Sequence, residues 1–128
     1  MSDIQQKLKL RELEIVDEHD QPRIRLSVEQ GLASIQLLSL QGEVGARIEL
    51  DQAGFSKIQL ASIAEPLLNV KLEMDPKGSH IKFDHQNGAS NYLFLNNQGA
   101  SGLVMLDAQQ QRKFAATVSE QGVLKIDQ

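Results

Sequence analysis

Several residue types that often carry chemistry are scarce or missing from this sequence. The 128 residues include no cysteine and no tryptophan, with four phenylalanines and one tyrosine. Without cysteine, disulfides and thiolate metal sites are excluded. The scarcity of aromatic rings argues against carbohydrate or single-strand binding, because such sites use rings as stacking platforms.

Long apolar runs are missing too. No segment approaches the roughly 20 apolar residues that a membrane-spanning helix needs. The opening segment, MSDIQQKLKLRELEI, has no apolar core of the kind found in signal peptides. These absences predict a soluble protein that resides in the cytoplasm and has no membrane partner.

Neither sign of charge dominates. Lys and Arg number 13 against 17 Asp and Glu, for a net charge of −4. This balance argues against a basic nucleic-acid arm or an acidic tail. Glu12, Glu14 and Glu29 are interleaved with the one basic cluster, so we expect that cluster to be neutralised and to bind no nucleic acid. The basic residues are Lys7, Lys9, Arg11, Arg23 and Arg25.

What the chain has is repetition and aliphatic residues, with 34 Leu, Ile and Val. Turn-forming residues recur about every 11 residues, and short alternating segments lie between them. The clearest copies are GASNYLFLNNQ (88–98) and GASGLVMLDAQ (99–109). The turn formers make two series: Gly31, Gly54, Gly78, Gly99 and Gly122, and between them Pro22, Gly45, Pro66, Gly88 and Gln111.

This spacing predicts an all-β fold in one domain, residues 1–128. The expected architecture is an antiparallel meander of about eleven short strands in 11-residue strand–turn units. It would form a flattened barrel, a sandwich, or an open sheet in an oligomer; a β-solenoid with coils of about 23 residues is the alternative. Residues 1–9 are expected to be either a frayed helical turn or disordered.

The turns favour hairpins. Asp75–Gly78 combines a proline, which presets φ, with a glycine, which accepts a positive φ. Asn87-Gly88 is a favoured pair for a tight hairpin. The registers that satisfy both sheet faces set Leu13 opposite Leu26 and Met74 opposite Ile81. The charged pairs that these registers create are Glu14 with Arg25, Glu73 with Lys82, and Lys71 with Asp84.

Strand alternation assigns side chains to two faces. One buried layer is predicted to contain Ile24, Leu26, Ile48, Leu50, Val70, Leu72, Ile81, Phe83, Phe114, Ala116, Leu124 and Ile126. The water-facing side is predicted to carry Arg25, Glu49, Lys71, Glu73, Lys82 and Lys125. The segments 35–40, 92–95 and 103–106 are apolar on both faces.

Those doubly apolar segments predict self-association, because a small meander has no spare layer to cover a second apolar face. The tandem repeat groups Tyr92, Phe94, Leu103 and Met105 on one face. It groups Leu93, Leu95, Val104 and Leu106 on the other. We therefore expect a homo-oligomer, a dimer or trimer. A lysine at Phe94 would either dissociate it or abolish soluble expression.

Three segments resemble a degenerate D-x-x-G-x-x-R-h turn: 20–24 (DQPRI), 41–48 (QGEVGARI) and 107–114 (DAQQQRKF). This turn is similar to that of bacterial tandem β-hairpin repeat proteins of unknown function. Pro22 and Gln111 stand where that family usually has glycine. The resemblance implies repetitive β structure and implies no activity.

Residues that could carry chemistry do not converge. His80 and His85 lie near Asp84 and Asp75, but positions 80 and 85 differ in strand parity, which argues against a metal site. His19 fits a polar turn. Neither a nucleophile elbow nor a phosphate-binding loop is present: Ser90, Ser101 and Gly99–Gly102 are expected in turns.

The sequence therefore predicts no catalytic, cofactor or metal site, and no enzyme. The expected function is that of a structural or protein-interaction module that self-associates through its sheet or binds a protein partner. A β-barrel or sandwich that binds a small apolar ligand is the alternative.

Overall fold

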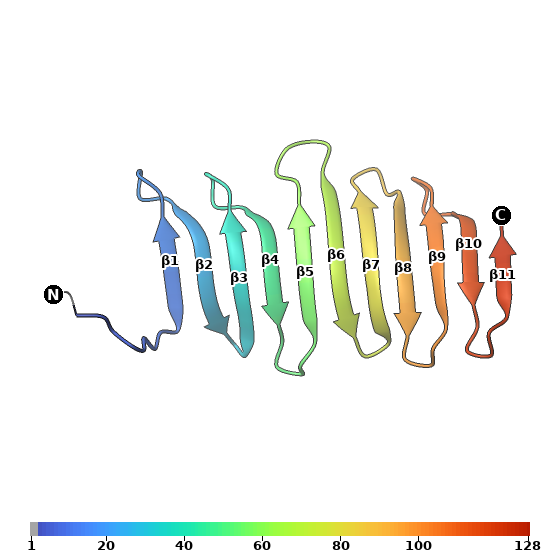
Figure 1. Cartoon of the computed structure of the whole chain (residues 1–128). Coiled ribbons are helices and arrows are strands. Elements are labelled where there is room, and N and C mark those ends of the chain that lie inside the picture. The colour runs from blue at the N-terminus through green and yellow to red at the C-terminus, as the bar shows by residue number, and fades with distance from the viewer. Residues whose placement is uncertain (1–2) are drawn as a thin grey trace.

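The computed structural model describes residues 3–128, and within that range it contains eleven strands and no helix (Figure 1). All strands belong to one sheet, in chain order, and each is antiparallel to the next. Their bounds are β1 (Glu12–Val16), β2 (Pro22–Glu29), β3 (Leu32–Leu38), β4 (Val44–Leu50), β5 (Ser56–Ala61), β6 (Leu68–Asp75), β7 (Gly78–His85), β8 (Ser90–Asn96), β9 (Ser101–Leu106), β10 (Arg112–Val118) and β11 (Leu124–Asp127).

The predicted all-β meander is confirmed, and the open sheet is the arrangement that forms. β1 and β11 are its two edges, so the sheet is not closed into a barrel, and antiparallel pairing throughout excludes a solenoid. Residues 1–9 were expected to be a frayed helical turn or disordered, and residues 1–2 of this segment lie outside the described range. Residues 3–9 are neither helix nor strand.

Seven of the ten connections use one turn geometry. The first residue of each turn donates its N–H to the carbonyl four residues later and accepts from the N–H three residues later. This pattern is the three-residue hairpin loop, a type I turn followed by a left-handed residue. The first residues are Asp17, Ser39, Asp51, His85, Asn96, Asp107 and Ser119. Each side chain also accepts a hydrogen bond from a backbone N–H of its own turn.

The residue with the left-handed backbone conformation, which has a positive φ, lies three positions after the first residue of the turn. Glycine occupies this position in five of these turns, while Asp20 (φ 61°) and Gln110 (φ 63°) occupy the other two. The glycine-like positions of the degenerate turns are therefore Asp20 and Gln110, not Pro22 and Gln111. Asn87-Gly88 ends one such loop instead of forming a two-residue turn.

Replacing Gln110 by glycine should stabilise the protein. A left-handed conformation costs an ordinary residue about 1–2 kcal/mol, whereas the entropy that glycine loses on folding is about 0.5–1 kcal/mol. We expect Gln110→Gly to raise the free energy of unfolding by about 0.5–1 kcal/mol, measured by urea denaturation at fixed protein concentration. Gln109→Gly, one residue earlier and without a positive φ, should lower it; equal effects would contradict the assignment.

One predicted register is confirmed and the other is wrong. Leu13 lies opposite Leu26, with Glu14 opposite Arg25. In the second hairpin, however, Leu72 lies opposite Ile81, so the pairing is displaced by two residues. The reason is the tightness of the turn: Asp75 pairs with Gly78, and its Oδ1 accepts hydrogen bonds from the N–H groups of Lys77 and Gly78. Glu73 therefore lies opposite His80, not Lys82.

The continuous register aligns one aliphatic row across all eleven strands. We call the side that carries this row the apolar face and the opposite side the polar face. The row contains Leu13, Leu26, Ile35, Ile48, Ile58, Leu72, Ile81, Leu93, Leu103, Ala116 and Ile126. All twelve residues predicted to share a layer lie on the apolar face, and all six predicted polar residues lie on the other.

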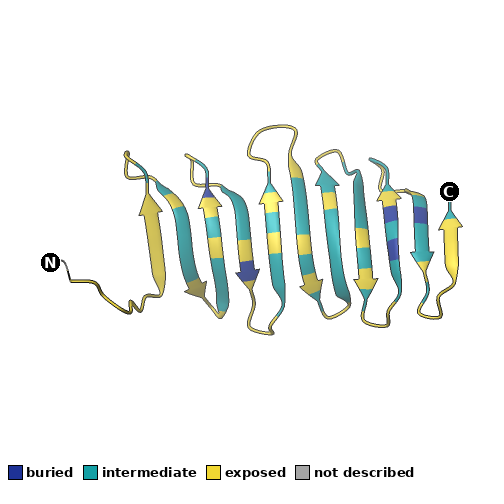
Figure 2. Cartoon of the chain, viewed as in Figure 1, coloured by how far each residue is buried: buried dark blue, intermediate teal, exposed yellow. Residues whose placement is uncertain are grey.

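The predicted burial of that layer is wrong for the single chain. Figure 2 shows exposed residues along the strands and only a few buried bands. The buried strand residues, Leu38, Glu49, Gly102, Val104 and Ala115, all lie on the polar face. A one-layer sheet has nothing to cover its apolar face, whereas long polar side chains fold over their neighbours on the other face.

Candidate functional site: an exposed apolar sheet face

The apolar face is the largest candidate site of the molecule. Ile48, near the middle of the row, is 49% exposed and Leu72 is 46% exposed. Two flanking rows, those of Ile15 and Val28, add further aliphatic residues, Phe83, Phe114, a few serines and Asn91. Among the strand residues of these three rows there is no charged side chain.

The surface area of the chain shows how unusual this exposure is. The chain exposes 9631 Å². A compact monomer of its mass, 14.2 kDa, would expose about 6,800 Å². The excess of about 2,800 Å² comes from the extended N-terminal segment and from a sheet that is open on both sides. A contiguous apolar face exposed over more than a few hundred Å² marks an interaction surface.

The faces of β8 and β9 that the tandem repeat predicted are wrong. Leu93 pairs with Leu103, and Tyr92 pairs with Val104. Paired residues share a face and differ here by an even number, whereas residues 11 apart differ by an odd number. Repeat-equivalent residues therefore lie on opposite faces. The apolar face carries Leu93, Leu95, Leu103 and Met105, and the polar face carries Tyr92, Phe94, Val104 and Leu106.

Phe94 consequently belongs to a small cluster on the polar face. Its ring lies over Gly102, where an added Cβ would come within 2.8 Å of Phe94 Cε1. The ring centroids of Tyr92 and Phe94 are 6.0 Å apart. Val104, which pairs with Tyr92, is buried in the same region. This end of the polar face is covered by its own side chains. A lysine at Phe94 is therefore expected to disturb the fold, which favours the loss of soluble expression over simple dissociation.

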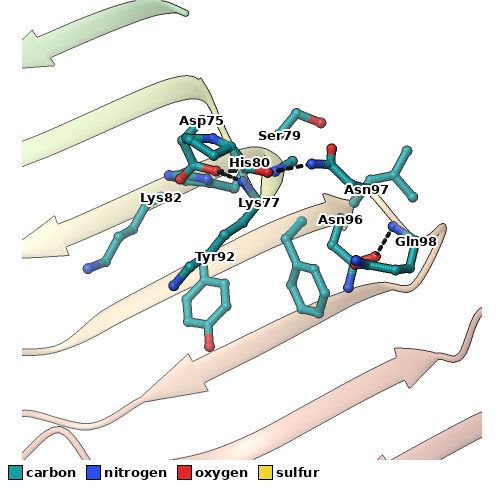
Figure 3. Close-up of a pocket in the computed structure, with 13 residues that line it drawn as sticks. Asp75, Lys77, Ser79, His80, Lys82, Tyr92, Asn96, Asn97 and Gln98 are labelled. Atoms are coloured by element: carbon teal, nitrogen blue, oxygen red, sulfur yellow. Dashed lines mark hydrogen bonds between the residues drawn. The ribbon is translucent and has the colours of Figure 1, made fainter.

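A shallow hollow of about 680 Å³ lies on the polar face beside the β6–β7 and β8–β9 turns (Figure 3). His80, Lys82, Tyr92 and Phe94 form part of its lining. Asn97 ties the two turns together, because its N–H donates to Lys77 O at 2.9 Å and its side-chain amide donates to Pro76 O. The hollow is wide and open, so it lacks the enclosure that a small-molecule site needs.

The histidines lie as strand parity predicts. His80 is on the polar face, 3.8 Å from Glu73 Oε1, and His85 closes a turn by accepting from Asn87 N–H. Asp84 pairs with Lys82 at 3.6 Å. The sequence pattern did not predict that Glu73 lies beside Asp75 and His80. One potential metal-ligand atom from each of the three residues lies within 4.8 Å of the other two. The signal was the E-x-D-x₄-H spacing, which the wrong register hid.

The other polar candidates have structural surroundings. Ser90 and Ser101 begin β8 and β9, and so lie in strands instead of the predicted turns. Gly102 is also inside β9. Arg25 is neutralised as expected, since its Nε lies 3.3 Å from carboxylate oxygens of both Glu12 and Glu14. His19 lies in the exposed first turn, 3.8 Å from Glu18.

Among the titratable side chains of residues 3–128, Asp107 is the one whose pKa the structure clearly shifts. Hydrogen bonds from the N–H of Gln111 and, secondarily, of Gln109 lower its pKa below the usual 3.8, helped by Lys113 at 3.6 Å. A lowered pKa stabilises the fold above about pH 4, and this contribution is lost as the pH falls through the folded-state value. Asp107→Asn should therefore have a lower Tm than the unmodified chain at pH 7. The difference should shrink towards pH 3; a difference independent of pH would contradict this.

Comparison with protein-family models, with curated proteins and with solved structures finds no match for this chain. Within residues 3–128, no helix is long and apolar enough to span a membrane.

Proposed function

We propose that this protein is a non-enzymatic structural module that self-associates through its apolar face, with a second copy of the chain as the cover. The observation that carries the proposal is the exposed aliphatic row that runs through all eleven strands. Water in contact with such a row costs free energy in proportion to its area, about 25 cal/mol per Å². Two rows in contact would remove that cost from both chains at once.

A second copy fits the surface for two reasons. Eleven strands, at about 4.8 Å spacing and about 20 Å long, give a face of about 1,000 Å², and a stable interface needs about 800 Å² per partner. The three rows also carry no charge, so a two-fold arrangement brings no like charges together. Two such sheets would pack as a sandwich, about 10 Å apart.

Binding of a small apolar ligand is the second candidate. A hollow of about 550 Å³ lies where the N-terminal segment meets β1–β4, and Leu8, Leu10, Leu26, Ile35 and Ile48 form part of its lining. This hollow favours the ligand only if the apolar face stays free of protein.

Sedimentation equilibrium combined with titration of a fluorescent apolar probe separates the two functions. Self-association predicts a mass of at least twice 14.2 kDa at micromolar concentration, and weak probe binding. A monomer that binds the probe at a saturable site would refute self-association and support the ligand.

A further inference from the structure

The β6–β7 hairpin gathers three metal-ligating side chains on the polar face. Glu73 and Asp75 come from β6, and His80 comes from β7. One potential ligand atom from each lies within 4.8 Å of the other two, and all three residues are partly buried. Figure 3 shows Asp75 and His80 side by side at the end of this hairpin.

The tight turn creates this convergence. Glu73 and Asp75 are two residues apart and so share a face, while Glu73 lies directly opposite His80. The residue opposite Asp75 is Gly78. Asp75 Oδ1 is fixed by the N–H groups of Lys77 (2.8 Å) and Gly78 (3.1 Å). Its Oδ2 takes no part in those hydrogen bonds.

Nearby lysines do not neutralise these carboxylates. Lys57 lies opposite Glu73 in the sheet register, yet its ammonium is 3.5 Å from Glu49 Oε1. Lys82 pairs with Asp84 instead. Across residues 3–128, His80 is the only basic side chain within 4.0 Å of either Glu73 or Asp75.

Glu49, which lies near this region, uses the basic side chains around it. Its side chain is nine-tenths buried, and its Oε1 forms ion pairs with Arg47 Nε at 3.4 Å and with Lys57 Nζ at 3.5 Å. It lines a second hollow, of about 260 Å³, together with Asp51, Glu73 and Asp75, and the only basic residue of that lining is Lys57. Because Arg47 and Lys57 both pair with Glu49, neither neutralises Glu73 or Asp75, and two such carboxylates in a partly buried hollow favour the entry of a cation.

We propose that Glu73, Asp75 and His80 bind one divalent cation of the zinc type. An imidazole with two carboxylates suits Zn²⁺, whereas Mg²⁺ and Ca²⁺ prefer sites made entirely of oxygen. Tetrahedral bonds of about 2.0–2.1 Å require ligand atoms about 3.4 Å apart, so side-chain rotation from the present 3.8 Å between Glu73 and His80 closes the site. The partly exposed hairpin leaves the fourth position to water. The site is on the polar face and does not depend on the proposed self-association.

Isothermal titration of the full chain with Zn²⁺ alone tests this proposal. We expect one Zn²⁺ per chain, and a rise in Tm when Zn²⁺ is added, because a ligand that binds the folded state stabilises it. Glu73→Gln and Asp75→Asn should each weaken binding at least tenfold. Both preserve side-chain volume, and the amide oxygen of Asp75→Asn can still accept the two turn hydrogen bonds, so folding is retained.

His19→Ala is the matched control. His19 forms a pair with Glu18 at the same 3.8 Å but belongs to no group of three metal-ligating side chains within residues 3–128, so removing it should leave Zn²⁺ affinity unchanged. His80→Ala should weaken binding as the carboxylate variants do. The proposal is overturned if the unmodified chain shows no saturable binding below 1 mM Zn²⁺, if the hairpin variants bind as tightly as the unmodified chain, or if His19→Ala weakens binding equally. In each case the sedimentation mass is unaffected, which keeps this test separate from self-association.

Discussion

Replacing Ile58 by lysine should dissociate the protein into folded monomers. Ile58 lies in β5, within the aliphatic row, and is 41% exposed in the single chain. The monomer therefore tolerates a lysine there, because the ammonium reaches water. In a face-to-face assembly the same charge would be buried without a partner, which costs several kcal/mol. A weakening of self-association by at least about a hundredfold follows, since 1.4 kcal/mol corresponds to tenfold.

Gln59→Lys is the control, since it adds the same charge to the next residue, on the polar face. It should leave the sedimentation mass unchanged, with circular dichroism showing a β-sheet spectrum for both variants. If both lysines dissociate the protein, or neither does, then the interface is not the apolar face.

Gly102→Ala should destabilise the fold by about 1–3 kcal/mol, the usual cost of overpacking. An added Cβ would lie 2.8 Å from Phe94 Cε1, 2.9 Å from Thr117 Cγ2 and 3.0 Å from Ala116 O. The Phe94 ring can move, but the Ala116 carbonyl belongs to the backbone of β10. We expect the loss to appear in urea denaturation, at a fixed protein concentration.

A double-mutant cycle with Phe94→Ala identifies the cause of this loss. If the clash with the ring dominates, then adding Gly102→Ala to Phe94→Ala should cost less than adding it to the unmodified chain. Strictly additive losses would mean that Phe94 does not pack over Gly102.

The faces of the sheet could be predicted from sequence because strand parity is local. Alternation alone placed Ile24 and Leu26 on one side and Arg25 on the other. The faces of β8 and β9 were the exception, because the tandem repeat suggested the wrong grouping of their residues. The register of the first hairpin was predictable as well, since Leu13 with Leu26 and Glu14 with Arg25 satisfy both faces together.

The register of the second hairpin, the burial of the apolar face and the role of Gly102 could not be predicted, because they depend on contacts between distant parts of the chain. Displacing the second hairpin by two residues keeps every side chain on its face, so the pattern could not distinguish Ile81 from Ser79 as the partner of Met74; the capped two-residue turn decides it. That error concealed the neighbourhood of Glu73 and His80. Burial was misjudged because it depends on how many layers the fold has, which no single strand records. Gly102 was taken for a turn glycine because nothing local indicates the ring above it.

The most direct test of self-association is an isotope-filtered nuclear Overhauser experiment on a mixture of labelled and unlabelled chains. The account predicts contacts between methyl groups of different chains, and specifically among Ile35, Ile48, Ile58, Leu72 and Leu93 on the apolar face. Absence of these contacts at micromolar to millimolar concentration, or contacts confined to the polar face, would contradict it.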